Sequence, residues 1–114
     1  MNDCLFCKII KKEIKADIIK ENDHAVAFND INPIAPSHIL IIPKTHIESV
    51  YHLNENNSYL LSRMSDLAND ISKNIIRATN GCRWIINTGD EGGQTVFHLH
   101  MHLVSGRKFG WPPG

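Results

Sequence analysis

The segment His98-Leu99-His100-Met101-His102-Leu103-Val104 carries a histidine at every second position, with an apolar residue after each one. Side chains of a β-strand alternate between two faces, so this spacing predicts a strand with its three histidines on one face. Leu99, Met101 and Leu103 then share the opposite face and can anchor the strand in a core. Neutral imidazole can act as nucleophile, general base or metal ligand, and its unperturbed pKa is about 6.5. The segment therefore predicts a functional site backed by a core.

Three interpretations of the histidine row compete. It can be a polar strand face, a site where one metal ion binds all three imidazoles, or a catalytic row. Same-face neighbours lie roughly 6.8 Å apart, which puts His98 and His102 roughly 13–14 Å apart, whereas zinc–nitrogen bonds are only about 2.0–2.1 Å. To bind one ion together, all three imidazoles would have to converge steeply on it. We favour a catalytic row, in which one histidine attacks, its neighbours orient it or bind charge, and one end of the row can join a metal site.

Length and charge restrict the class of protein. The chain has 114 residues, which fits one domain, and its 12 basic and 12 acidic residues cancel. This balance argues against binding to polymeric nucleic acid and leaves a small phosphorylated ligand open. Neither a signal peptide nor a membrane span is visible, and an odd number of cysteines does not suggest a disulfide framework. We expect a cytoplasmic protein, or also a nuclear one in a eukaryote.

The remaining pattern predicts an α+β fold with an antiparallel sheet of about five strands, one short helix and one long helix. The expected strands are Asp17–Glu21, Ala25–Phe28, His38–Pro43, Cys82–Asn87 and His98–Val104. The turn between the first two strands falls at residues 22–24. The short helix lies within residues 1–14 and is capped by Asp3.

The long helix shows the clearest periodicity. Its apolar stripe consists of Leu60, Met64, Leu67, Ile71 and Ile75, at steps of three or four residues. Asn54 or Ser58 is expected to cap its start, and Gly81 to end it.

Directly before the histidine row stands Gly92-Gly93-Gln94-Thr95. Glycine allows the backbone to approach a ligand closely, and successive N–H groups in a turn form an anion-binding nest. Gln94 and Thr95 add side-chain donors. Such a pair of glycines is often only a turn, but its place at the start of the row predicts a phosphate cradle.

These motifs resemble the histidine-triad family, whose signature alternates three histidines with apolar residues as residues 98–104 do. The resemblance covers nearly the whole chain as a single domain, 1–114, with a C-terminal tail at 108–114. The segments that resemble the nucleotide-binding branch of the family are residues 30–33, residues 38–46, Gly92–Thr95 and the ending Gly110-Trp111-Pro112-Pro113-Gly114.

The resemblance implies a hydrolase of purine nucleoside 5′-phosphoramidates, such as adenosine 5′-monophosphoramidate. His100 would be the nucleophile and form a nucleotidyl-histidine, with His98 and His102 completing the catalytic row. His102, Asn87 and the Gln94–Thr95 region match the positions that donate to phosphoryl oxygens. Thr95 also matches the position that helps to protonate the leaving amine. The alternative interpretation of Thr95 is a structural hydroxyl at the start of a strand.

The resemblance also implies a nucleoside site. Asp30 matches the position that accepts both ribose hydroxyls, and its alternative is an ordinary turn aspartate before Pro33. The positions expected to contact the base or the phosphate are Phe6, Ile9, Phe28, Ile31, Asn87, Gly93, Gln94, Thr95, Val96, His100 and His102. A flat apolar slot fits a purine better than a pyrimidine.

Cys4-x-x-Cys7 departs from many members of that branch. Some histidine-triad proteins bind structural zinc through such a pair and two histidines, which here would be His46 and His98. Two ordinary thiols are the alternative. No cofactor is expected to be required for the chemistry, and His38 is expected to be structural.

The resulting prediction is a homodimeric enzyme whose tail reaches toward the partner's site. The alternatives are a dinucleoside polyphosphate hydrolase, a non-catalytic nucleotide-binding scaffold and a small zinc-stabilised interaction domain.

Overall fold

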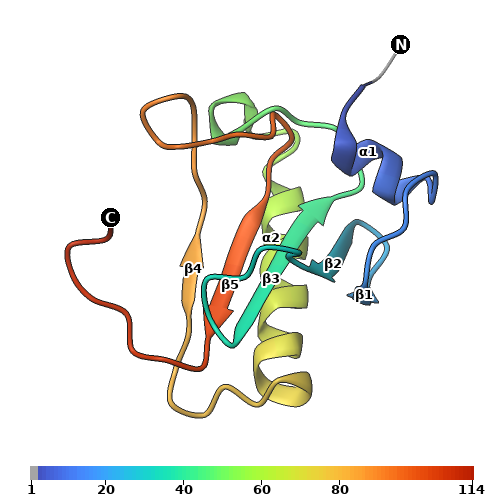
Figure 1. Ribbon diagram of the computed structural model, residues 1–114. Coiled ribbons are helices and arrows are strands. Elements are labelled where there is room, and N and C mark those ends of the chain that lie inside the picture. The colour runs from blue at the N-terminus through green and yellow to red at the C-terminus, as the bar shows by residue number, and fades with distance from the viewer. Residues whose placement is uncertain (1–2) are drawn as a thin grey trace.

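The computed structural model describes residues 3–114, which form one antiparallel sheet of five strands in the order β1-β2-β3-β5-β4 (Figure 1). The strands are β1 (Ile18–Glu21), β2 (Ala25–Asn29), β3 (Ser37–Pro43), β4 (Arg83–Ile85) and β5 (Met101–Ser105). The helical segments are α1 (Leu5–Ile10), η1 (Val50–His52), α2 (Tyr59–Asp70) and η2 (Ile71–Ile75). The α+β class, the strand number and the two main helices are confirmed. Across residues 3–114, no helix has the length and apolarity needed to cross a bilayer.

The central strand β3 is buried on both faces. Ile39 and Ile41 pack into the main core with α2, whereas Leu40 and Ile42 pack on the other face with Phe6 of α1. Helix α2 therefore covers one side of the sheet and α1 covers part of the other (Figure 1). This double burial explains why residues 39–42 are apolar without alternation.

The first two strands form the expected hairpin. The Asn22 side-chain oxygen accepts the backbone N–H groups of His24 and Ala25, both at 2.9 Å, which closes the turn. The second strand continues one residue beyond the prediction, to Asn29, which pairs with Ile39 of β3.

The long helix follows the predicted stripe only as far as Ile71. Ile75 is 44% exposed, and Ile76 packs against the main core in its place. The cause is a π-helical turn over η2, in which the Ile76 N–H donates to the Ile71 carbonyl at 2.9 Å. One extra residue per turn shifts the apolar face by one position. The assignment of Ile75 to the core is therefore wrong.

The helix ends without the predicted glycine. Arg77 adopts φ 50°, a left-handed conformation that ends the helix, and the Ala78 N–H donates back to the Ser72 carbonyl at 2.8 Å. Gly81, with φ 109°, lies in the later turn into β4. The predicted end at Gly81 is therefore wrong.

The predicted caps also differ from the structure. Cys4, not Asp3, occupies the N-cap position of α1, and Ser58 precedes α2 without a side-chain capping bond. The Asn54 side chain accepts the N–H groups of Asn56 and Asn57, so it organises the turn before the helix.

Strand β1 begins at Ile18, one residue later than predicted, and two further strands are shorter than predicted as well. Strand β4 has three residues, and β5 begins at Met101, which pairs with Ile41. Before Met101 the chain leaves the sheet, and the Leu99 N–H donates to the Ile47 carbonyl at 2.6 Å. His98 and His100 therefore precede the strand and lie outside regular secondary structure.

Candidate active site

The histidine row keeps its alternation although only part of it is strand. Leu99, Met101 and Leu103 are buried in the core with α2, as predicted. His98 and His100 are buried on the other side, where the Phe6 ring of α1 lies with its centroid 5.8 and 5.1 Å from theirs. The rings of His100 and His102 are 5.1 Å apart. Strand β5 and the segment before it thus present a row of imidazoles, of which His98 and His100 lie against Phe6 of α1.

The protonation of His100 follows from its backbone partner. Its Nδ1 lies 2.7 Å from the carbonyl oxygen of His98, which can only accept, so Nδ1 carries the proton. The lone pair is then on Nε2. Burial lowers the pKa of His100, against the hydrogen bond to the His98 carbonyl, which raises it. His100 is therefore neutral near pH 7 and can attack an electrophile.

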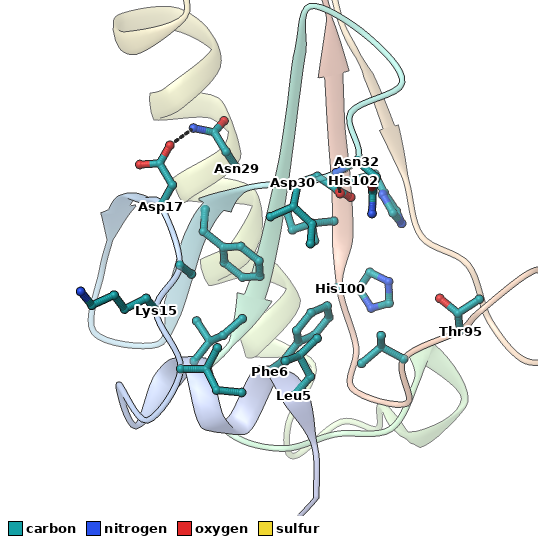
Figure 2. A pocket seen from close by; sticks show the side chains of 17 residues that line it. Leu5, Phe6, Lys15, Asp17, Asn29, Asp30, Asn32, Thr95, His100 and His102 are labelled. Carbon is teal, nitrogen blue, oxygen red and sulfur yellow. Dashed lines mark hydrogen bonds between the residues drawn. The ribbon is translucent and has the colours of Figure 1, made fainter.

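A cavity of about 420 Å³ opens beside the histidine row (Figure 2). His100, His102 and Thr95 stand at one end, and Lys15, Asp17 and Asn29 at the other. The predicted site residues that line it are Phe6, Ile9, Phe28, Asp30, Ile31, Thr95, Val96, His100 and His102. Most of the wall between its ends is apolar, as a slot for a flat ring requires.

Asp30 is held in place at the cavity by two partners. One carboxylate oxygen accepts the Asn32 N–H at 2.8 Å, and the other lies 3.4 Å from His38 Nε2. The first contact is the predicted turn role of this residue. The next residue, Ile31, is 91% exposed and forms the rim of the slot.

The loop before the row is built differently from the predicted cradle. The Gly93 N–H donates to Asp90 and the Gln94 N–H to Gly89, both at 3.0 Å, so these donors close the loop itself. The buried Gln94 amide donates to the carbonyls of Glu48 (2.7 Å) and Val96 (3.1 Å). Gln94 therefore braces the loop, which leaves Thr95 and Val96 facing the cavity.

The loop itself also requires its glycines. A Cβ on Gly92 would lie 2.4 Å from the Thr88 carbonyl oxygen, and Gly93 has φ 81°. Asn87 lies half-buried after β4, and neither it nor Gly93 is among the residues that line the cavity.

His38 lies within this site, although the sequence analysis predicted that His38 is structural. Its Nε2 is 2.9 Å from His102 Nδ1, and its Nδ1 accepts the Ile34 N–H at 3.1 Å. Leu40 pairs with His102 across the sheet, so His38, two residues earlier, shares a face with His102. That register was the signal that the sequence alone did not provide.

A second cluster joins Cys4 and Cys7 to His46 and His98. The His98 Nδ1 lies 3.4 Å from Cys4 Sγ, 3.5 Å from Cys7 Sγ and 3.1 Å from His46 Nδ1. Its Nε2 donates to the Pro43 carbonyl at 2.9 Å, so the Nδ1 lone pair faces the cysteines. The predicted set of four therefore meets in space.

The chemistry of this cluster can be tested against zinc. A tetrahedral zinc ion with bonds of about 2.0–2.3 Å has neighbouring ligand atoms roughly 3.3–3.8 Å apart. The separations here, 3.1–3.5 Å, are close to that range. Burial lowers the pKa of His98 to about 4, which keeps its Nδ1 unprotonated. The donor set therefore fits a closed structural zinc site.

Comparison with known proteins gives concordant matches. Residues 3–109 match the family model described as "Scavenger mRNA decapping enzyme C-term binding". An uncharacterized HIT-like protein of Synechococcus elongatus is 46% identical over 98% of this chain and 97% of its own. The purine nucleoside phosphoramidase of Escherichia coli K12 is 44% identical over 95% of this chain and 91% of its own.

The architecture is shared with solved structures as well. A HIT family hydrolase from Legionella pneumophila superposes with a TM-score of 0.94 at 42% identity, covering 98% of this chain and all of its own. The sequence signature, the family model and the structural match agree. The chain belongs to the histidine-triad (HIT) family.

Proposed function

We propose that this protein hydrolyses the P–N bond of purine nucleoside 5′-phosphoramidates through a nucleotidyl-histidine on His100. The observation that carries this proposal is the contact between His100 Nδ1 and the His98 carbonyl, which leaves the Nε2 lone pair available beside the cavity. The phosphoramidase from Escherichia coli, 44% identical, supports the choice of substrate. Aminoacyl-adenylate-like compounds present the same reacting phosphorus.

The reaction divides into two displacements at phosphorus. In the first, His100 Nε2 forms a bond to the α-phosphorus while the P–N bond breaks, and the leaving amine takes up a proton. Thr95, exposed at the same end of the cavity, is the hydroxyl we assign to deliver that proton. In the second, water attacks the phosphorus and returns a proton to Thr95, the bond to His100 breaks with its electron pair left on Nε2, and the nucleoside monophosphate leaves.

The cavity supplies the binding contacts for this substrate. Phe6, Ile9, Phe28 and Ile31 form the slot that we assign to the purine. Asp30, whose carboxylate is already oriented by Asn32, offers acceptors for the ribose hydroxyls. His102, next to His100, donates to the phosphoryl oxygens as charge develops.

We also propose that Cys4, Cys7, His46 and His98 hold a structural zinc ion. The ion would tie α1, which carries Phe6 and Ile9, to the segment before β5. With four protein ligands it has no open position, so it takes no part in the reaction. Thiolate ligands require a reducing compartment, in accord with the cytoplasmic (in a eukaryote also nuclear) location that we propose.

We further propose a homodimer in which the tail, residues 108–114, approaches the partner's site. Trp111 is 85% exposed, and exposed aromatic side chains are typical of docking segments. Arg83 donates to the Gly110 carbonyl at 2.9 Å, which directs the tail along β4 (Figure 1).

A substrate panel tests the proposed activity. Adenosine and guanosine 5′-phosphoramidates are compared with diadenosine polyphosphates and a pyrimidine phosphoramidate by kcat/KM. We expect the purine phosphoramidates to be hydrolysed fastest. Faster hydrolysis of diadenosine polyphosphates would assign the protein to a dinucleoside polyphosphate hydrolase. Tight nucleotide binding without turnover would assign it to a scaffold.

A further inference from the structure

His38 sits between the two polar groups that flank the cavity. The residue is 5% exposed, and its Nε2 faces both His102 Nδ1, at 2.9 Å, and an oxygen of Asp30, at 3.4 Å. On its far side, Nδ1 receives the backbone N–H of Ile34 at 3.1 Å. All ring nitrogen positions of His38 are therefore occupied by the fold.

These partners determine which ring nitrogen of His38 carries the proton. A backbone N–H can only donate, so His38 Nδ1 must be the unprotonated nitrogen. A neutral His38 then carries its proton on Nε2, where both neighbours are acceptors. The His102 nitrogen is closer than the Asp30 oxygen, so His102 receives the main hydrogen bond.

The same argument determines which ring nitrogen of His102 carries the proton. Its Nδ1 accepts from His38, so it has no proton there, and the proton of a neutral His102 is on Nε2. Since Nδ1 is turned toward His38 and the ring lines the cavity, the Nε2–H belongs to the edge turned away from His38. Burial keeps His102 and His38 neutral by lowering the pKa of each.

We propose that His38 is a positioning residue that holds His102 in the tautomer with its proton on Nε2, so that His102 presents an N–H donor to the phosphoryl oxygens. This inference rests on the proposed function for the identity of the phosphoryl acceptor. The assignment of the His102 tautomer is independent of that function. The backbone of Ile34 sets the direction of the chain of hydrogen bonds, which runs from Ile34 through His38 to His102. If the hydrogen bonds ran in the opposite direction, His102 Nε2 would carry no proton. It would then turn a lone pair toward the negatively charged phosphoryl oxygens.

Nitrogen-15 NMR of the substrate-free protein reads the tautomer directly. Long-range proton–nitrogen correlations at pH 7.5 distinguish a histidine protonated on Nδ1 from one protonated on Nε2. We expect Nε2–H for both His38 and His102, and Nδ1–H for His100. A wild-type His102 protonated on Nδ1, or on both nitrogens, overturns the proposal.

Two substitutions test whether His38 is the cause. His38→Leu removes the donor, whereas His38→Gln keeps an amide N–H that can donate and a carbonyl that can accept from Ile34. His24→Gln, at the exposed hairpin, is the matched control. Removal of a direct donor to a transition-state oxyanion lowers kcat by about 10²–10³-fold, so an indirect partner should account for less. We therefore expect His38→Leu to lower kcat about 10- to 100-fold with a smaller change in KM, and His38→Gln to retain most of kcat.

The tautomer measured by NMR and the value of kcat together distinguish a failure of this proposal from a failure of the proposed function. His38→Leu should mix the two tautomers of His102, and His38→Gln should keep Nε2–H. If His38→Leu leaves both the tautomer and kcat unchanged, or if His38→Gln fails as His38→Leu does while both remain folded, the donor role is wrong. If phosphoramidates are not substrates, only the proposed function fails, because the NMR result needs no substrate.

Discussion

The Nδ1 atom of His100 lies 2.7 Å from the backbone carbonyl oxygen of His98, two residues earlier in the chain. This contact uses the backbone of His98 and leaves its side chain for the cluster with Cys4 and Cys7. One residue thus serves two sites through different atoms. His102 is oriented instead by a side chain, that of His38. The three histidines of the row therefore have three different environments.

Asp30→Asn tests the ribose contact. The amide keeps the acceptor for the Asn32 N–H but loses the charge, and hydrogen bonds to charged groups contribute about 1.5–3 kcal/mol. We expect weaker binding of nucleoside monophosphates, measured by calorimetry, and little further loss with a 2′,3′-dideoxy ligand. Asp66→Asn, on the exposed surface, is the control. Equal discrimination against the dideoxy ligand by mutant and wild type would leave Asp30 as a turn residue only.

The zinc proposal predicts about one zinc ion per chain in protein purified without chelator, measured by elemental analysis. Replacement of Cys4 and Cys7 by Ser should remove the metal and lower the unfolding temperature, because α1 loses its tie to His98. Part of the activity should remain, since His100 is intact. Cys82→Ser is the control, because Cys82 is exposed and lies outside the cluster. Metal-free wild-type protein with two titratable thiols would contradict the proposal.

The tail is tested by deletion of residues 108–114. If it reaches the partner's site, its loss should change selectivity among leaving amines more than affinity for the nucleoside monophosphate. Light scattering should show a dimer for the full chain. A monomer at micromolar concentration, or equal effects on all substrates, would argue against this arrangement.

Stability should depend on pH through His102. Burial, with the nearby His100 and His38, lowers the pKa of His102 to about 4, whereas the unfolded value is about 6.5. The unfolded state therefore binds the proton more readily, and the free energy of unfolding should be constant above about pH 6.5 and fall between pH 6.5 and 4. Urea titrations across this range measure it. His102→Gln should make the decline shallower, and an unchanged slope would count against the assignment.

The sequence predicted those features that depend on local alternation and on short motifs. The apolar face of residues 99, 101 and 103 follows from side-chain alternation, and the buried position of β3 follows from its unbroken apolar run. The shift from Ile75 to Ile76 did not, because a π-helical turn leaves no periodic signal in so short a stretch. The helix end at Arg77 was missed because a non-glycine residue takes the left-handed conformation there.

Long-range pairing explains the other differences at the site. The role of His38 depends on the register between β3 and β5, which a single sequence does not specify. The loop at Gly92–Thr95 was predicted by position, but the N–H groups of Gly93 and Gln94 close its own turn, and the Gln94 side chain reaches across to Glu48. Local patterns located the site, whereas tertiary contacts determine which atoms are available in it.

Rapid-quench trapping identifies which histidine carries the nucleotide during turnover. Wild-type protein is mixed with a radiolabelled adenosine 5′-phosphoramidate, quenched within milliseconds, digested and mapped by mass spectrometry. We predict a nucleotide attached to His100 and none on the His100→Ala variant, which should still bind adenosine monophosphate measurably. Label on His98 or His102, or turnover by His100→Ala at the wild-type rate, would contradict it.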